Sequence, residues 1–464
     1  MEDLYRLSAR DALDLFASRA LSPVELMEAV IRRAEQVEPE INAFPHTYYD
    51  EALEAAREAE ARYAGRGPRP RPLEGIPVAI KDETAIRGQP LTQASLIHKD
   101  DVADHTSLVA ERILRAGGIV HARAATPEFS AAPFTHSRLY GITRNPWNPA
   151  YSPGGSSGGG AAALAAGSAT LANGSDIGGS IRIPATFCGV VGFKPPYGRV
   201  PVEAPYNLDH YCHDGPLART VSDCAVLQNV IAGPHPADPV ALRPKLRIPG
   251  ELRGVDGWRI GYTPDLGYDV DPEVRAGVLE AVEALRAAGA TVEEVAVGWT
   301  HGDVEAAARA HFGALFGGSV DEERRAYRDL MSAYTVKFGE ESGDVTMADY
   351  VRGLSVEAEI HAALSRIHRR YRALVGPGFG VAKLRAGDDC LDVDVYDFLL
   401  TVVFNICSRN PVVSVPSGRT ADGVPTGVQI AGRPYDDVSV FRAARALERV
   451  RPWPLIAEPA AVRA

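Results

Sequence analysis

The chain has 464 residues, of which 45 % are hydrophobic and 23 % are charged, a balance typical of a soluble enzyme with a large core. Its formal net charge is −11 and no block of like charge occurs, so the basic surface that nucleic-acid binding requires is not expected. No basic segment followed by an apolar one opens the sequence, and no apolar run reaches the ~18 residues of a membrane helix. We therefore expect a cytoplasmic protein without a signal peptide.

Five cysteines are scattered along the chain: Cys188, Cys212, Cys224, Cys390 and Cys407. Their number is odd and none forms a CxxC pair, so the sequence predicts neither a disulfide framework nor a zinc ribbon. We expect reduced and mostly buried thiols.

Helical patterns dominate residues 1–65. The run Ser22-Pro23-Val24-Glu25 has the form of a capping box, and apolar residues follow it at three- and four-residue intervals. A second helical pattern covers residues 50–63, and the Gly- and Pro-rich segment 65–72 ends it as a stiff connector. We expect these helices to form an N-terminal clamp on the outside of a core.

Strands alternate with helices after residue 73. Strands are predicted at 76–81, 119–122, 258–262 and 291–297, and helices at 106–116, 160–166, 220–231 and 272–288. Thr220 and Asp223 have the spacing of a further capping box, and residues 258–297 that of a βαβ unit. This alternation indicates an α/β architecture around a large sheet.

Residues 302–390 differ from the rest because they are mostly helical in pattern and richly charged. We interpret them as a helical insertion or lid near the substrate pocket. Strand patterns at 410–416 and 425–430 and a helix at 438–450 then return to the core. Because core-type segments lie on both sides of the insertion, we predict a single domain over 1–464, with its core at 73–235 and its return at 395–464.

Two serines stand in glycine-dense turns, Ser156 in GGSSGG and Ser180 at the end of DIGGS. Glycine brings no side chain to a core, so its concentration around hydroxyls indicates that backbone N–H groups must approach something closely. A serine nucleophile needs a base, and no histidine lies between residues 154 and 192. Lys81 ends an apolar strand and could act as that base if its pKa is lowered by burial.

The turn at residues 176–180 offers the second requirement of acyl transfer, backbone donors for a developing oxyanion. Its two glycines, Gly178 and Gly179, let consecutive N–H groups converge. Asp176 and Arg182 flank the turn, and we expect them to pair and hold it.

Two other interpretations of these motifs are open. GGSSG fits the G-x-S-x-G nucleophile elbow of α/β-hydrolases, with Ser156 as nucleophile and with Asp214 or Asp238 and then His301 or His311 downstream. However, a loop at 145–153 precedes it rather than a strand, and the Ser180 turn is left unexplained. A phosphate-binding loop lacks its G-x-x-x-x-G-K-[ST] motif.

Several histidines could be metal ligands. The cluster His210-Tyr211-Cys212-His213 has no second cluster to complete a tetrahedral set, so we expect a polar loop that lines the pocket or the surface. His361 and His368 share a helical face, which we expect to be solvated.

The run from 154 to 194 closely resembles the signature of the amidase signature family of serine hydrolases, and residues 75–82 resemble the family's lysine strand. The similarity spans about residues 5–235 and 395–450. Supporting matches are found at 126–129, 145–148, 215–219 and 427–430.

The resemblance implies a mixed sheet of about eleven strands covered by helices, and a Ser-cisSer-Lys triad. On that pattern Ser180 would be the acylated nucleophile, Ser156 a bridging serine in a cis peptide, and Lys81 the neutral base. The N–H groups of Ile177, Gly178, Gly179 and Ser180 would form the oxyanion hole. Ser157, Asp176 and Arg182 would support these groups, and no metal or organic cofactor is implied.

The function implied is amidohydrolysis of a small-molecule carboxamide, anilide or carbamate (an arylamidase or urethanase) through an acyl-enzyme. The alternative is the amidase subunit of a glutamine-dependent amidotransferase. Ser175 stands where a threonine is commoner, and residues 374–380 depart from the Thr-Pro-rich strand end of many members. Substrate choice therefore depends on the divergent residues 302–390, and the oligomeric state is open, with a homodimer as one option.

Overall fold

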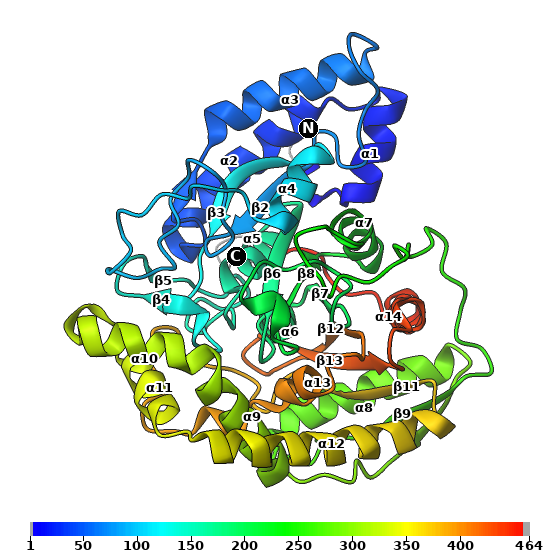
Figure 1. The fold of residues 1–464 in the computed structure, drawn as a ribbon. Helices are drawn as coiled ribbons and strands as arrows, with labels where there is room; N and C mark the ends of the chain where they lie inside the picture. The colour runs from blue at the N-terminus through cyan, green and yellow to red at the C-terminus, as the bar shows by residue number, and fades with distance from the viewer. Residues whose placement is uncertain (1–2, 458–464) are drawn as a thin grey trace.

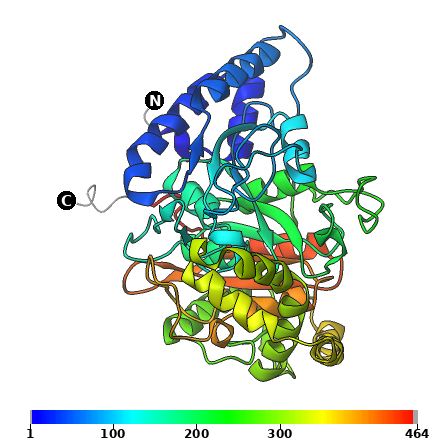
Figure 2. The same cartoon turned by 60° about the vertical axis from the view of Figure 1, so that its left-hand side comes forward.

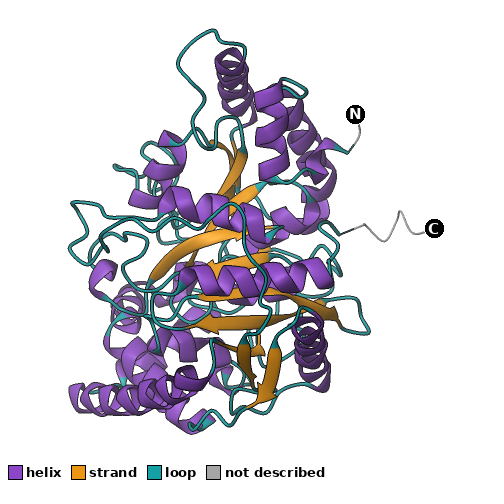
Figure 3. Cartoon of the chain, turned by 90° about the vertical axis from the view of Figure 1, so that its right-hand side faces the viewer, coloured by secondary structure: helices purple, strands orange, loops and turns teal. Residues whose placement is uncertain are grey.

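The computed structural model describes residues 3–457. These residues form an eleven-stranded mixed sheet, and helices cover the sheet (Figures 1 and 3). This confirms the predicted fold class. In spatial order the strands are β1 (His46–Thr47), β3 (Ile119–Ala124), β2 (Pro77–Lys81), β6 (Leu171–Asp176), β8 (His213–Ala218), β7 (Val191–Lys194), β12 (Val412–Arg419), β13 (Pro425–Gly432), β11 (Ala373–Pro377), β9 (Arg259–Tyr262) and β10 (Thr291–Glu294).

The helices include those that were predicted, together with two that were not, at residues 182–188 and 403–406. They are α1 (Ala9–Ser18), α2 (Pro23–Ile41), α3 (Tyr49–Tyr63), α4 (Leu108–Arg115), α5 (Gly158–Ala166), α6 (Arg182–Cys188), α7 (Val221–Ile231), α8 (Pro272–Ala287), α9 (His301–Ala314), α10 (Phe316–Tyr327), α11 (Ala333–Gly343), α12 (Met347–Arg370), α13 (Val403–Ile406) and α14 (Asp437–Val450). A two-stranded ribbon, β4 (His136–Ser137) with β5 (Gly141–Ile142), lies outside the main sheet.

The two predicted capping boxes have different outcomes. Ser22 caps α2, and the Glu25 carboxylate accepts the Ser22 N–H at 2.8 Å, so this box is complete. Thr220 caps α7 by accepting the Asp223 N–H at 3.0 Å. The Asp223 carboxylate accepts the N–H of Arg10 at 2.9 Å, which joins α7 to the start of α1. Local sequence signals cannot show such a long-range partner.

Strand alternation builds a core on each face of the sheet. Along β2, Val78 and Ile80 belong to the core with α7, α8 and α14, whereas Ala79 belongs to the core with α5 and α6. Successive strand side chains point to opposite faces, which explains this division. Every residue of α5 is buried, and its glycines, which have no side chain, and its small alanines let it pack closely against the sheet.

The N-terminal helices α1–α3 lie at one end of the molecule, and α9–α12 lie at the other (Figures 1 and 2). Helices α9–α12 pack on one another, and the chain then enters the sheet as β11, between β13 and β9. The segment that departs from the family pattern thus contributes an interior strand, the third from the β10 edge of the sheet. Among residues 3–457, no helix combines the length and the apolar composition needed to cross a bilayer.

The parallel pairing of β2 with β6 decides where the candidate site forms. Val78 pairs with Leu171 and Ala79 with Ala172, so the carboxyl ends of both strands meet at one edge of the sheet. Lys81 ends β2, and Ser175 and Asp176 end β6. The Lys81 N–H donates to the Asn173 side chain at 2.9 Å, which fixes this register locally.

Candidate active site

Lys81 is the centre of a buried polar cluster. Its side chain is 1 % exposed, and its Nζ donates to the Oγ atoms of Ser156 at 2.7 Å and of Ser175 at 2.8 Å. Burial lowers the pKa of Lys81, while the nearby Glu83, Asp214 and Asp176 carboxylates oppose that shift. A lysine beside a serine hydroxyl, with a pKa below its ordinary value, can act as a general base.

The turn that carries Ser156 has no room for a side chain at Gly155. The Gly155–Ser156 peptide bond is cis. A Cβ on Gly155 would lie 2.2 Å from the carbonyl oxygen of Phe134, so glycine alone fits here. Ser157 then connects this turn to the next one, because its N–H donates to the Ser180 carbonyl at 3.1 Å.

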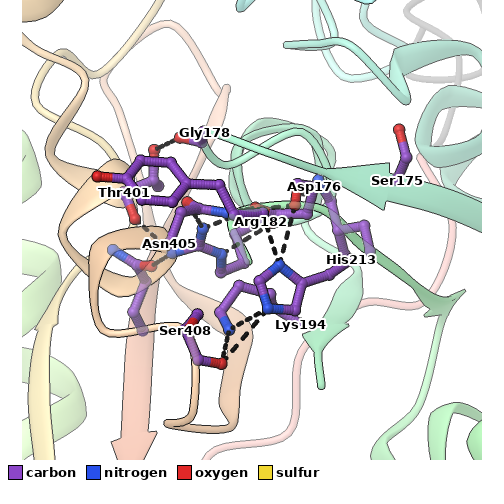
Figure 4. A network of polar contacts seen from close by, with 12 residues as sticks. Ser175, Asp176, Gly178, Arg182, Lys194, His213, Thr401, Asn405 and Ser408 are labelled. Carbon is purple, nitrogen blue, oxygen red and sulfur yellow. Dashed lines mark hydrogen bonds and ion pairs between the residues drawn. The ribbon is translucent and has the colours of Figure 1, made fainter. Parts of the chain in front are cut away.

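The turn from Asp176 to Ser180 joins β6 to α6 and exposes a row of backbone donors. Within the part of the chain that the structure describes, the N–H groups of residues 177–180 find no hydrogen-bond acceptor. Thr401 Oγ donates to the Gly178 carbonyl at 2.5 Å, which orients this peptide (Figure 4). Gly179 has φ 131°, a conformation that side chains disfavour. Such free donors beside a hydroxyl are suited to stabilise an oxyanion.

Asp176 and Arg182 form the predicted pair, and both side chains are fully buried. Arg182 donates to both Asp176 carboxylate oxygens, at 2.9 and 2.8 Å (Figure 4). Its remaining hydrogens are accepted by the Thr401 carbonyl and by the side chains of Gln429 and Asn405. Burial would raise the pKa of Asp176, but the guanidinium and the Asn405 amide lower it to about 2.

Glu83 belongs to this cluster and was not predicted from the sequence. Its Oε1 lies 3.0 Å from Lys81 Nζ, and the Ser130 hydroxyl donates to its carboxylate. Burial raises the pKa of Glu83, but the charge of Lys81 and the hydrogen bonds outweigh burial and leave the pKa below its ordinary value. The sequence signal for Glu83 was its position two residues after the candidate lysine. A tight turn follows β2 and returns the chain toward Lys81, so a carboxylate at this position comes close to it.

Two cavities meet at Ser180, and they differ in character. Ser130, Ile177, Ser180 and Phe316 line both of them. The first is mainly aromatic and aliphatic, and its further lining includes Phe134, Ile183, Phe312, Tyr334, Phe338, Tyr396 and Leu399. We call it the apolar cavity.

The second cavity is more polar, and we call it the polar cavity. Its lining includes Ser156, Ser175, Glu83, Glu203, Asp214 and His213. Burial and the Glu83 carboxylate raise the pKa of Asp214 to about 7, although the charge of Lys81 acts against them. Ser156 and Ser175 line this cavity and not the apolar one.

The candidate histidines have other partners. His311 contacts Asp209 at 2.7 Å, and His210 contacts Glu357 of α12 at 3.3 Å. The ligand atoms of Asp209, His210 and His311 lie within 4.8 Å of one another, and these contacts join the loop before β8 to α9 and α12. Lys81, rather than a histidine, contacts Ser156, which argues against the nucleophile elbow.

The expectation of a solvated face at His361 and His368 is wrong for His368. This side chain is buried at 6 % exposure, because the face of α12 that it shares with Leu364 packs against the core. All five cysteines are free and four are buried, as expected.

The comparisons with known proteins agree with this geometry. The amidase family model matches residues 25–441. The chain is 35 % identical to an acylamidase of Rhodococcus erythropolis over 97 % of both chains, and 35 % identical to a glutamyl-tRNA(Gln) amidotransferase component from Symbiobacterium thermophilum over 96 % of both. A bacterial aryl acylamidase of known structure has a TM-score of 0.89 at 29 % identity, covering 96 % of both chains.

The fold is that of an aryl acylamidase of known structure, and Lys81 rather than a histidine contacts Ser156. The chain belongs to the amidase signature family. Family membership places it among enzymes that act on amide C–N bonds, and it contradicts the α/β-hydrolase alternative.

Proposed function

We propose that the chain hydrolyses the carboxamide, anilide or carbamate bond of a small molecule through an acyl-enzyme on Ser180. One observation carries this proposal: the hydrogen bond from Lys81 to Ser156 lies beside Ser180, at the end of a turn whose N–H groups are unoccupied. This arrangement supports Lys81 as the base, Ser156 as the relay and the N–H groups of the turn as oxyanion donors around the Ser180 hydroxyl.

In the proposed mechanism, neutral Lys81 accepts the Ser156 hydroxyl proton while Ser156 accepts that of Ser180. Ser180 Oγ attacks the carbonyl carbon, and the N–H groups of residues 177–180 stabilise the oxyanion. The proton then returns through Ser156 to the leaving nitrogen as the C–N bond breaks. Water hydrolyses the resulting ester by the same relay and regenerates Ser180.

The two cavities suggest which part of the substrate goes where. The leaving nitrogen must receive its proton from Ser156, which lines the polar cavity and not the apolar one. The leaving amine would therefore depart through the polar cavity, and the apolar cavity would hold the acyl or alkoxycarbonyl group. Its aromatic lining favours an aryl or medium-sized aliphatic group.

Substitution of the proposed nucleophile tests this function. Ser180→Ala should lower kcat/KM for an aryl anilide by at least about 10³-fold, and Lys81→Met should be similarly severe, with residual activity that rises with pH. Ser18→Ala, at an exposed serine at the end of α1, is the matched control. A serine-directed phosphonate should label Ser180. Labelling of Ser156, or a Ser180→Ala variant of near wild-type rate, would refute the mechanism.

A second candidate is the amidase subunit of an amidotransferase, which the similarity to glutamyl-tRNA(Gln) amidotransferase components supports. The cavities favour the first function, because the apolar cavity is lined mainly by aromatic and aliphatic side chains, and Lys337, the one lysine or arginine among the described residues that line either cavity, is paired with Glu341 at 3.5 Å. The α-carboxylate of glutamine would need a cation near Ser180. Glutamine hydrolysis that depends on a co-purifying partner would favour the second function.

Light scattering would distinguish a monomer, a homodimer and a complex, and cell fractionation would test the cytoplasmic location.

A further inference from the structure

Lys81 has three hydrogen-bond acceptors around Nζ, and together they match its protonated form. They are Ser156 Oγ at 2.7 Å, Ser175 Oγ at 2.8 Å and Glu83 Oε1 at 3.0 Å. An ammonium group has three N–H donors, whereas a neutral amine has two and a lone pair. The surroundings of Lys81 are thus complementary to the state that it reaches only after taking up a proton.

The loop that carries Ser130 holds Glu83 at this distance from Lys81. Ser130 donates to the Glu83 carboxylate, and its own hydroxyl lies 2.9 Å from that of Thr126. Phe129 and Ser130 have φ values of 52° and 57°, a backbone conformation that non-glycine residues rarely adopt. This backbone conformation places Ser130 between the two cavities and directs its hydroxyl to Glu83.

We propose that Glu83 is a positioning residue of the reaction: its carboxylate stabilises Lys81 as an ammonium during acylation and so sets the pH range in which the enzyme is active. This inference rests on the proposed function. Glu83 itself stays ionised, since the proton moves from Ser180 to Ser156 and from Ser156 to Lys81. Interactions that strengthen as the transition state forms increase the rate of the chemical step.

The charge of Glu83 has two consequences for catalysis that can be separated. It favours the protonated, inactive form of Lys81 in the free enzyme, and it makes Lys81 a stronger base in the transition state. Other ionisable groups around the pair also contribute to its field: Asp176 on β6, Asp214 on β8, and Glu203, Tyr206 and Cys212 in the segment before β8. Among the described residues, Glu83 alone contacts Lys81 Nζ as an ion pair.

Glu83→Gln tests the inference because it removes the charge and keeps the shape. The acid limb of the pH profile of kcat/KM should move down by about 1–2 pH units. The alkaline plateau should fall by about 3- to 10-fold, because a weaker base takes up the proton. The two profiles should therefore cross, with the variant the faster enzyme at acid pH. The substrate is an aryl anilide that the wild type hydrolyses.

Glu111→Gln is the matched control, because Glu111 on α4 pairs with Arg115 at 3.1 Å, away from the site; its profile should coincide with that of the wild type. Glu83→Asp keeps the charge but draws it back by one methylene, so its acid limb should lie between those of the wild type and of Glu83→Gln. If Glu83→Gln does not fold, this intermediate shift carries the test.

An acid limb that stays in place overturns the inference, whether or not the plateau falls, because a purely structural role of Glu83 would lower the rate at every pH. This result is distinguishable from failure of the proposed function. In that case the wild type would lack amidase activity or would not depend on Ser180.

Discussion

Replacing Arg182 by methionine should expose the cost of burying Asp176. In the native chain both side chains are 0 % exposed, and Asp176 accepts two hydrogen bonds from the guanidinium and one from Asn405 at 2.8 Å. Arg182→Met leaves a buried carboxylate without its counter-charge. Breaking a buried pair by removing one partner costs about 3–5 kcal/mol, far more than the net contribution of an intact pair.

The pH dependence gives this prediction its sign. The wild-type pKa of Asp176 is about 2, below its unfolded value, so its contribution to stability is full above pH ~4 and is lost as the pH falls toward 2. Without Arg182, burial dominates and raises that pKa above the unfolded value. The free energy of unfolding of Arg182→Met should therefore increase as the pH falls from 7 to 5, where the wild type changes little.

Urea unfolding followed by circular dichroism at several pH values measures both effects. Arg275→Met is the control, because Arg275 forms a half-exposed pair with Asp265 at 3.4 Å and its loss should cost less than about 1 kcal/mol. Adding Asp176→Asn to Arg182→Met should recover part of the lost stability by removing the isolated charge. A double variant no more stable than Arg182→Met, or a cost near that of the control, would refute the reasoning.

Three further predictions concern single residues. Gly179→Ala should abolish activity, because a Cβ there would lie 2.2 Å from a threonine hydroxyl, whereas Gly254→Ala, with nothing within 4 Å, should leave activity unchanged in the same assay. Burial and the nearby Arg182 lower the pKa of Lys194 to about 7. The free energy of unfolding of the wild type should therefore rise from pH 7 toward 10, by at most about 1.4 kcal/mol per pH unit. Lys194→Met should remove this rise in urea titrations. Tyr334→Phe removes the acceptor of the buried Glu128 N–H at 2.7 Å and should cost about 1–3 kcal/mol in the same titrations; a smaller loss would indicate that another acceptor replaces it.

Much of this molecule could be predicted from local sequence because the signals involved are themselves local. The capping box at Ser22 and the apolar alternation of β2 depend on neighbours a few residues away. The turns around Ser156 and Ser180 were also evident, since glycine concentrates where side chains do not fit.

The surroundings of these motifs depended on packing between distant segments. Arg182 is satisfied by Thr401, Asn405 and Gln429, which lie 219 to 247 residues away in sequence. No local pattern marks such acceptors, because a buried guanidinium can be satisfied by any carbonyl that the fold brings near.

The sequence by itself determined the family, the sheet with its helices, and the serines and lysine of the candidate site. Only the tertiary structure decided that Glu83 contacts Lys81, that Ser180 stands between an apolar and a polar cavity, and that residues 373–377 form an interior strand of the sheet. The reason is physical: backbone preferences are set within a few residues, whereas cavities and buried charge pairs arise where remote segments meet.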